Sequence, residues 1–216
     1  TADEKKWQEL FMKLASTSPS GLVRLHVASA MQRLPLESRW PIATALSLHA
    51  EDADDRQQPL MIWYGIEPAV AADPMKGVEL IKQARLPTVR RLVARRIAEM
   101  IEDKPEAVDA LIVAMAGIDK AAGEDVLRGL AAGLNGFSTA RKPKGWDEAA
   151  KALEAHGSEE MKELTRFKRI QRLKKELEFQ GRPDTERADE DEQIRLSPPL
   201  PPQERVFATG DIVWGK

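Results

Sequence analysis

The chain has 216 residues, and its 33 basic residues nearly balance 35 acidic ones, so that the formal net charge is −2. This balance argues against a dedicated nucleic-acid binder, which usually carries a basic excess. The sequence contains no cysteine, which excludes disulfides, thiolate metal sites and covalent haem attachment within it. The polar first ten residues do not resemble a signal peptide, and no apolar run approaches the roughly 20 residues that span a bilayer.

Apolar residues recur at spacings of three and four from the beginning to about residue 180, which predicts an all-α fold. Proline and serine mark the breaks between helices. Ser38 is expected to cap the third helix, and Pro68 to interrupt the fourth. The expected helices span residues 4–16, 21–34, 38–50, 59–72, 73–85, 87–101, 104–118, 120–134, 146–157 and 158–179.

Several helices begin at intervals typical of helical repeats, near Gly21, Pro59, Pro87 and Lys120. Residues 18–34 and 85–100 also share an order: proline, then Val-Arg, then an alanine within the apolar stripe. This order resembles the HEAT repeat, a helix hairpin that stacks on its neighbours into a solenoid. We therefore expect residues 1–180 to form a HEAT-like α-solenoid of antiparallel helix pairs.

The composition changes after residue 180. Residues 181–205 are charged and rich in proline, with few apolar side chains, which predicts an extended or disordered linker. Apolar residues return in 206–216, and we interpret these as the possible start of a further domain.

An acidic loop is the first candidate site. Glu51, Asp52, Asp54 and Asp55 follow His49, and oxygen-rich loops can hold calcium. The EF-hand pattern fails, however, because Trp63 stands where the twelfth-position glutamate would be required. A solvated loop or a helix cap fits better. A third interpretation is a row of ion pairs between stacked repeats. In it the loop acids would contact arginines of a later helix: Asp52, Asp54 and Asp55 on one side, and Arg90, Arg91 and Arg95 on the other.

The aromatic stretch Trp63-Tyr64-Gly65 is the second candidate. It could border a small-molecule site together with the acidic loop. We favour a packing hot spot instead, because the helix around it is apolar on more than one side, and such a helix lies between neighbours. Gly65 would then admit an adjacent helix, and Tyr64 would need a partner for its hydroxyl.

Other motifs predict no chemistry. The three histidines, His26, His49 and His156, lack metal-ligand spacing. The basic run in 166–175 alternates with apolar residues and is expected to be an amphipathic helix. Arg195 with Pro198 and Pro201 formally fits a proline-rich ligand motif, which arises often by chance. We therefore assign no catalytic, cofactor-binding or metal-binding residue, and expect no enzyme activity in this segment.

Six segments resemble one family: residues 22–24 (LVR), 28–35 (ASAMQRLP), 39–46 (RWPIATAL), 49–55 (HAEDADD), 59–68 (PLMIWYGIEP) and 89–99 (VRRLVARRIAE). They look like the HEAT-like helical region of planctomycete-type membrane-bound dehydrogenase-like proteins, also called haem-binding CxxCH proteins. The resemblance covers about residues 7–102. It implies an upstream dehydrogenase-like propeller, a downstream c-type cytochrome and an extracytoplasmic (periplasmic) location.

In that family the cytochrome domain begins with a glycine and an aromatic residue ahead of C-x-x-C-H. Gly210 and Trp214 match these two positions. The resemblance therefore implies that haem c lies in the parent protein, beyond Lys216. We expect a non-catalytic helical scaffold between two redox domains of the same polypeptide. The alternative is a stand-alone solenoid that binds a separate protein on its concave face.

Overall fold

The computed structural model describes residues 2–135, 137 and 141–149. The chain divides into two units, residues 1–171 and 172–216, and every described residue belongs to the first. Within the described residues the fold is all-α, as predicted, and contains no strand. Its helices are α1 (Ala2–Thr17), α2 (Gly21–Met31), α3 (Leu36–Ser47), η1 (Ala50–Asp52), α4 (Gln58–Ala72), α5 (Pro74–Gln83), α6 (Pro87–Ala98), α7 (Pro105–Ala116) and α8 (Lys120–Gly133).

The helix starts follow from local chemistry. Ser20 accepts a hydrogen bond from the Val23 amide at the start of α2, and Asp119 does the same for Ala122 in α8. Proline stands in the first turn of α4, α5, α6 and α7, where its missing N–H leaves no helical bond unmade. The starts predicted near Gly21, Pro59, Pro87 and Lys120 are confirmed to within one residue.

Two local predictions were wrong. Ser38 does not cap α3, because the helix begins at Leu36 and the Ser38 hydroxyl instead accepts a hydrogen bond from Gln8 Nε2 at 2.7 Å. Helix α4 also continues through Pro68. The proline removes one backbone bond, but α4 packs against α2, α3, α5 and α6, and these contacts hold both of its halves in line.

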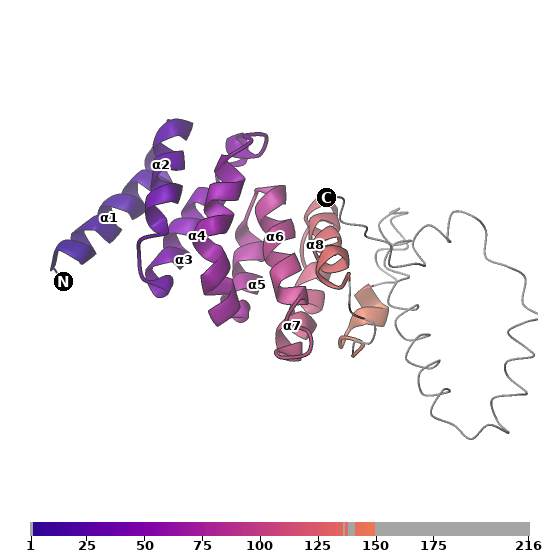
Figure 1. Ribbon diagram of the computed structural model, residues 1–216. Helices are drawn as coiled ribbons and strands as arrows, with labels where there is room; N and C mark the ends of the chain where they lie inside the picture. Colours follow the sequence, from indigo (N-terminus) through magenta and orange to yellow (C-terminus); the bar gives the residue numbers. More distant parts are fainter. Residues whose placement is uncertain (1, 136, 138–140, 150–216) are drawn as a thin grey trace, which may run out of the picture. The chain divides into compact units, whose positions relative to one another are not determined.

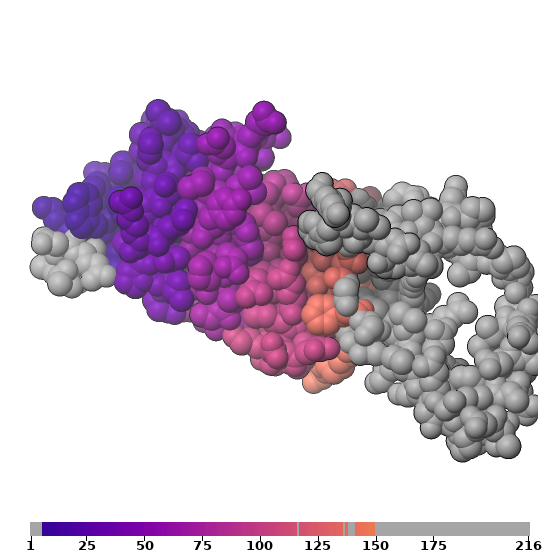
Figure 2. Space-filling view, viewed as in Figure 1, coloured from indigo at the N-terminus to yellow at the C-terminus, as the bar shows by residue number. Residues whose placement is uncertain are grey.

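The principal contacts join each helix to the next helix and to the next but one. They place α2, α4, α6 and α8 in one row, here the even row, and α1, α3, α5 and α7 in a second, odd row (Figure 1). In Figure 2, where colour follows residue number, the first unit consequently shows successive bands of colour from indigo to orange. Segments close in sequence are therefore close in space.

Helices α2, α4 and α6 of the even row run parallel and in register. Arg96 Nε lies 2.9 Å from Glu67 Oε1, and these residues occupy the same position in α6 and α4. A Cβ added at Gly65 would lie 3.6 Å from the carbonyl oxygen of Ala28, which occupies the matching position of α2. Equivalent residues of α2, α4 and α6 therefore lie at the same level. Helix α8 is offset by two residues, because its Gly129 and Gly133 face Ala94 and Ala98 of α6.

The core runs along the seam between the two rows. Its even-row members are almost fully buried and recur at helical spacing: Val27, Met31, Ile62, Ile66, Val93, Ile97, Val126 and Leu130. Helices α6 and α8 approach most closely, because Gly129 and Gly133 of α8 face the backbone of α6. This close approach makes the α6–α8 seam the one least able to accept added volume.

The remaining sequence predictions lie outside the described residues. These are the domain limits at 180 and 205, the linker 181–205, the segment 206–216 with Gly210 and Trp214, the expected helix 158–179 with its basic run 166–175, His156 and the proline-rich motif at 195–201. Of the expected helix 146–157, only residues 146–149 are described, and they are helical.

Candidate functional site

Two buried arginine–aspartate pairs are the main polar features of the described core. Arg24 of α2 is 2% exposed and forms a bidentate pair with Asp52, with Nε at 2.7 Å from Oδ2. Its third donor, Nη1, bonds to the Ser18 carbonyl at 2.7 Å. The hydrogen bonds that Arg24 donates to Asp52 raise the pKa of Arg24 above its usual value. This guanidinium therefore ties the end of α1 and the loop before α4 to α2.

Arg90 of α6 repeats this arrangement. Its Nε lies 2.9 Å from Asp125 Oδ2, and its Nη1 bonds to the Ala84 carbonyl at 2.8 Å. Arg24 and Arg90 occupy the same position in α2 and α6, and each reaches a carbonyl six residues earlier. The two contacts are thus equivalent parts of a repeated unit.

Neither pair is arranged for catalysis. A general acid or base must be free to exchange a proton with a substrate, whereas all four side chains are buried against their partners. Buried ion pairs of this kind fix which elements pack together, since an unpaired buried charge is strongly unfavourable. We regard both pairs as structural.

The expected contact between the acidic loop and the α6 arginines is replaced by other pairings. Asp52 meets Arg24, and Arg90 meets Asp125, because the even row brings each arginine to the following even-row helix or to the loop that precedes it. Asp54 is exposed. Arg91 and Arg95 are also exposed, and Arg95 pairs with Glu99 of its own helix at 2.9 Å.

Asp55 is a helix cap, one of the roles considered for the acidic loop. Its carboxylate accepts hydrogen bonds from the backbone amides of Gln58 at 2.7 Å and Gln57 at 2.8 Å, at the start of α4. These two bonds, that from Gln58 first, lower the pKa of Asp55. Glu51, Asp52 and Asp55 are therefore used in pairing and capping, and Asp54 is exposed. No group of three or more metal-ligating side chains occurs in the described part of the chain.

The aromatic stretch divides between core and surface. Gly65 is buried, and a Cβ there would overlap the terminal methyl group of Met31. Trp63 is half-buried and packs against the core. Tyr64 is 56% exposed and so is not part of the packed hot spot that we expected. The physical reason is its position: it lies four residues after Leu60 on the outward stripe of α4, away from Ile62 and Ile66.

A shallow groove lies between α1 and α3. It has a volume of about 490 Å³, and Met12, Pro41 and Ile42 contribute its apolar lining. A second hollow of about 460 Å³ shares Met12 and Pro41 and extends to His49 and Gln83. The His49 ring lies 2.8 Å from both the Ala15 carbonyl and Glu51 Oε1. The groove can accept an apolar group, but it brings no nucleophile and base together.

Haem c cannot be held covalently by this chain, because its attachment requires the cysteines of C-x-x-C-H and the sequence contains none. No helix in the described ranges is long and apolar enough to cross a membrane. Comparison with family models, with curated proteins and with solved structures found no match to the chain.

Proposed function

We propose that the described helices form a HEAT-like solenoid that acts as a non-catalytic scaffold. The observation that carries this proposal is the repeated arginine contact of Arg24 and Arg90, each in the same position of its helix. The contacts of each helix with the next and the next but one also agree with a stack of helix hairpins, in which each hairpin covers the apolar face of its neighbour.

Hydrogen exchange tests the solenoid. In a stack, coupling passes mainly between neighbours. Replacing Asp125→Asn should therefore lower amide protection in α6 and α8 and leave α1, α2 and α3 unchanged. The matched variant Asp52→Asn should lower amide protection in α1, α2 and α3 and leave α6 and α8 unchanged. An equal loss of protection throughout the described helices would overturn the solenoid.

We further propose that this scaffold links a dehydrogenase-like propeller to a c-type cytochrome domain in a larger extracytoplasmic redox protein. The support is the family resemblance of residues 7–102 and of the Gly210–Trp214 pair. The described residues would act through geometry, holding two redox domains at a set separation, and residues 181–205 would tether the second domain.

The gene sequence beyond the codon for Lys216 tests this link. An in-frame Cys-x-x-Cys-His within about ten codons supports the cytochrome domain. An in-frame stop codon directly after the codon for Lys216 would overturn it. Limited proteolysis tests the tether, since an extended linker should be cut between residues 181 and 205. Resistance to cleavage there would contradict the linker.

A second candidate is a solenoid that binds a separate protein. Three exposed residues of α2 and α4 favour it: Leu22, Leu60 and Tyr64. Aromatic side chains such as Tyr64 are enriched at protein interfaces, and a more apolar core lies at their centre. Capture of one partner by the intact chain, lost on Tyr64→Ala without a change in melting temperature, would support this candidate over the scaffold.

A further inference from the structure

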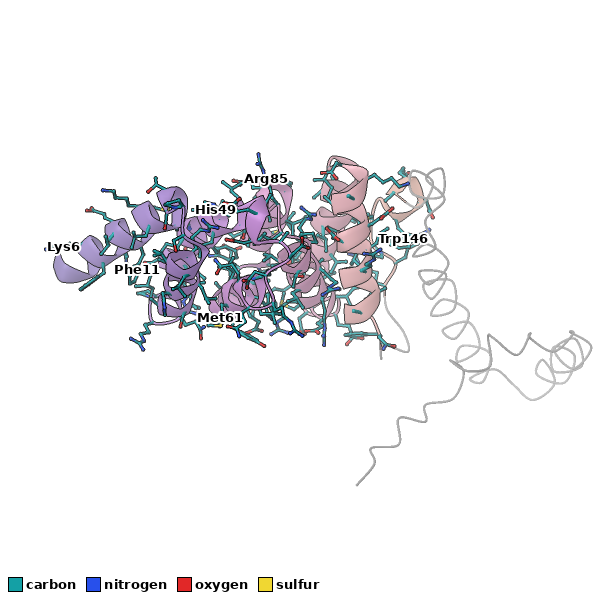
Figure 3. The ribbon with its side chains drawn as sticks, turned by 90° about the horizontal axis from the view of Figure 1, so that it is seen from above. Lys6, Phe11, His49, Met61, Arg85 and Trp146 are labelled. Carbon is teal, nitrogen blue, oxygen red and sulfur yellow. The ribbon has the colours of Figure 1, made fainter. Side chains whose placement is uncertain are left out.

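The outer surface of the even row carries three pairs of exposed side chains, one pair on each of α2, α4 and α6. Each pair is spaced four residues apart, so both members lie on one face of their helix, and all six side chains are exposed. We call this surface the even-row face and define it by Leu22, His26, Leu60, Tyr64, Arg91 and Arg95. Figure 3 shows Met61, next to Leu60, on the side of the unit opposite His49 and Arg85.

One half of the even-row face is apolar. Leu22 is 65% exposed on α2, and Leu60 and Tyr64 are exposed on the adjacent α4. No hydrogen bond to the Tyr64 hydroxyl occurs within the described residues. A tyrosine that presents both an apolar ring and an unused hydroxyl is suited to an interface.

The other half is basic. The Arg91 guanidinium pairs with no acidic group of the described residues. Arg95 is 53% exposed at its side chain, and its one acidic partner among the described residues is Glu99, one turn along its own helix. An exposed pair of this kind contributes about 0–1 kcal/mol, so an incoming carboxylate can replace it. Counted from the Arg96–Glu67 contact, Tyr64 of α4 lies at the level of Val93, between the levels of Arg91 and Arg95 along the adjacent α6.

We propose that the even-row face binds an extended segment of a partner protein in which a short spacer separates acidic residues from apolar ones. This inference rests on the protein-binding candidate function above. The acidic residues would lie over Arg91 and Arg95, and the apolar residues over Leu60 and Tyr64. Helices in contact lie about 8–10 Å apart, and an extended chain advances about 3.3 Å a residue. The two groups of the ligand are therefore separated by about three residues.

The charge pattern favours a peptide over a nucleic acid. Glu67 and Glu99 lie at the α4–α6 seam, where Arg96 contacts both. A phosphate backbone crossing this seam would meet two carboxylates beside the arginines. A peptide can place its acidic groups at one end only and avoid them.

Fluorescence anisotropy of a labelled synthetic peptide tests the proposal with the full chain. The probe has an acidic run, a Ser-Gly-Ser spacer and a Leu-Ser-Phe end. We expect saturable binding in the micromolar range that weakens as salt is added, because exposed charges are screened. Arg91→Glu should weaken binding about tenfold by placing like charges together. Tyr64→Ala should weaken it about fivefold by removing the apolar anchor.

Lys82→Glu is the matched control, because Lys82 is an exposed cation on α5 of the odd row and pairs with Glu79. It should leave the affinity unchanged. No binding at low salt, equal binding of a peptide with scrambled order, or tighter binding of single-stranded DNA would each overturn the proposal. The hydrogen-exchange test described above probes the solenoid arrangement and does not depend on peptide binding. A failure of peptide binding to the even-row face can therefore be told apart from a failure of the solenoid scaffold.

Discussion

The close approach of α8 to α6 is open to a direct test through Gly129. In the variant Gly129→Ala, the new Cβ would overlap the carbonyl oxygen of Arg91 and would lie 2.7 Å from the Cβ of Ala94. Carbon atoms in contact normally stand about 3.5–4.0 Å apart. Helix α8 would therefore have to move away from α6 by about 1 Å.

Two opposing effects set the size of the change. Alanine favours a helix over glycine by about 1 kcal/mol. Overpacking a close contact costs about 1–3 kcal/mol, and the upper end applies because backbone atoms of α6 cannot rotate out of the way. We expect Gly129→Ala to lower the free energy of unfolding by about 1–2 kcal/mol.

Gly123 of the same helix is the matched control. A Cβ there meets its nearest atoms, in Met115, at 3.9 Å, which is ordinary contact. Gly123→Ala should therefore stabilise the chain by up to about 1 kcal/mol. Gly65→Ala should fall between the two, because the overlapping atom is the mobile end of Met31.

Urea unfolding followed by far-ultraviolet circular dichroism measures all three variants. The midpoint should fall for Gly129→Ala and rise for Gly123→Ala, with unchanged slopes that confirm a common unfolded state. If Gly129→Ala were as stable as Gly123→Ala, the α6–α8 seam would not be as close as described.

Three further outcomes are expected. Arg90→Met should lower the free energy of unfolding, measured in urea, by about 3–5 kcal/mol, because Asp125 is left buried without its partner. The double variant Arg90→Met with Asp125→Leu should recover much of this loss. If the effects of the two single changes simply added in the double variant, the pairing would be contradicted. Asp55→Ala should lower the melting temperature at neutral pH. Because the pKa of Asp55 is lowered in the folded chain, its contribution is present above the unfolded pKa and lost as pH falls through the folded pKa. The difference between the two chains should vanish in acid, and a difference that persisted there would refute the capping role. Tyr64→Ala should change the unfolding free energy by less than about 0.5 kcal/mol, whereas Ile62→Ala should cost about 2–5 kcal/mol; equal losses would mean that Tyr64 is packed.

Helix positions were predictable because their signals act over one or two residues. Proline in a first turn and a capping serine or aspartate mark a start whatever lies nearby in space. Continuity through Pro68 was not predictable on that basis, since it depends on the helices that pack around α4.

The polar pairs were harder to predict. The sequence shows which residues can pair but not which helices become neighbours. Arg24 is a charged residue among apolar ones in the sequence, yet it is buried against Asp52. The usable signal was the shared Val-Arg of 23–24 and 89–90, which marks equivalent positions and hence equivalent roles. Asp125 carried no such signal.

The pattern of contacts between helices has a mechanical consequence. Each principal contact reaches no further than the second helix along the chain, so a pull applied at α1 and α8 would pass through every interface in series. Small rotations at successive interfaces would add up, and the ends could shift without any interface opening. The described helices should therefore behave as a spring whose stiffest part is the glycine-lined contact of α6 with α8 and whose softer part lies towards α1.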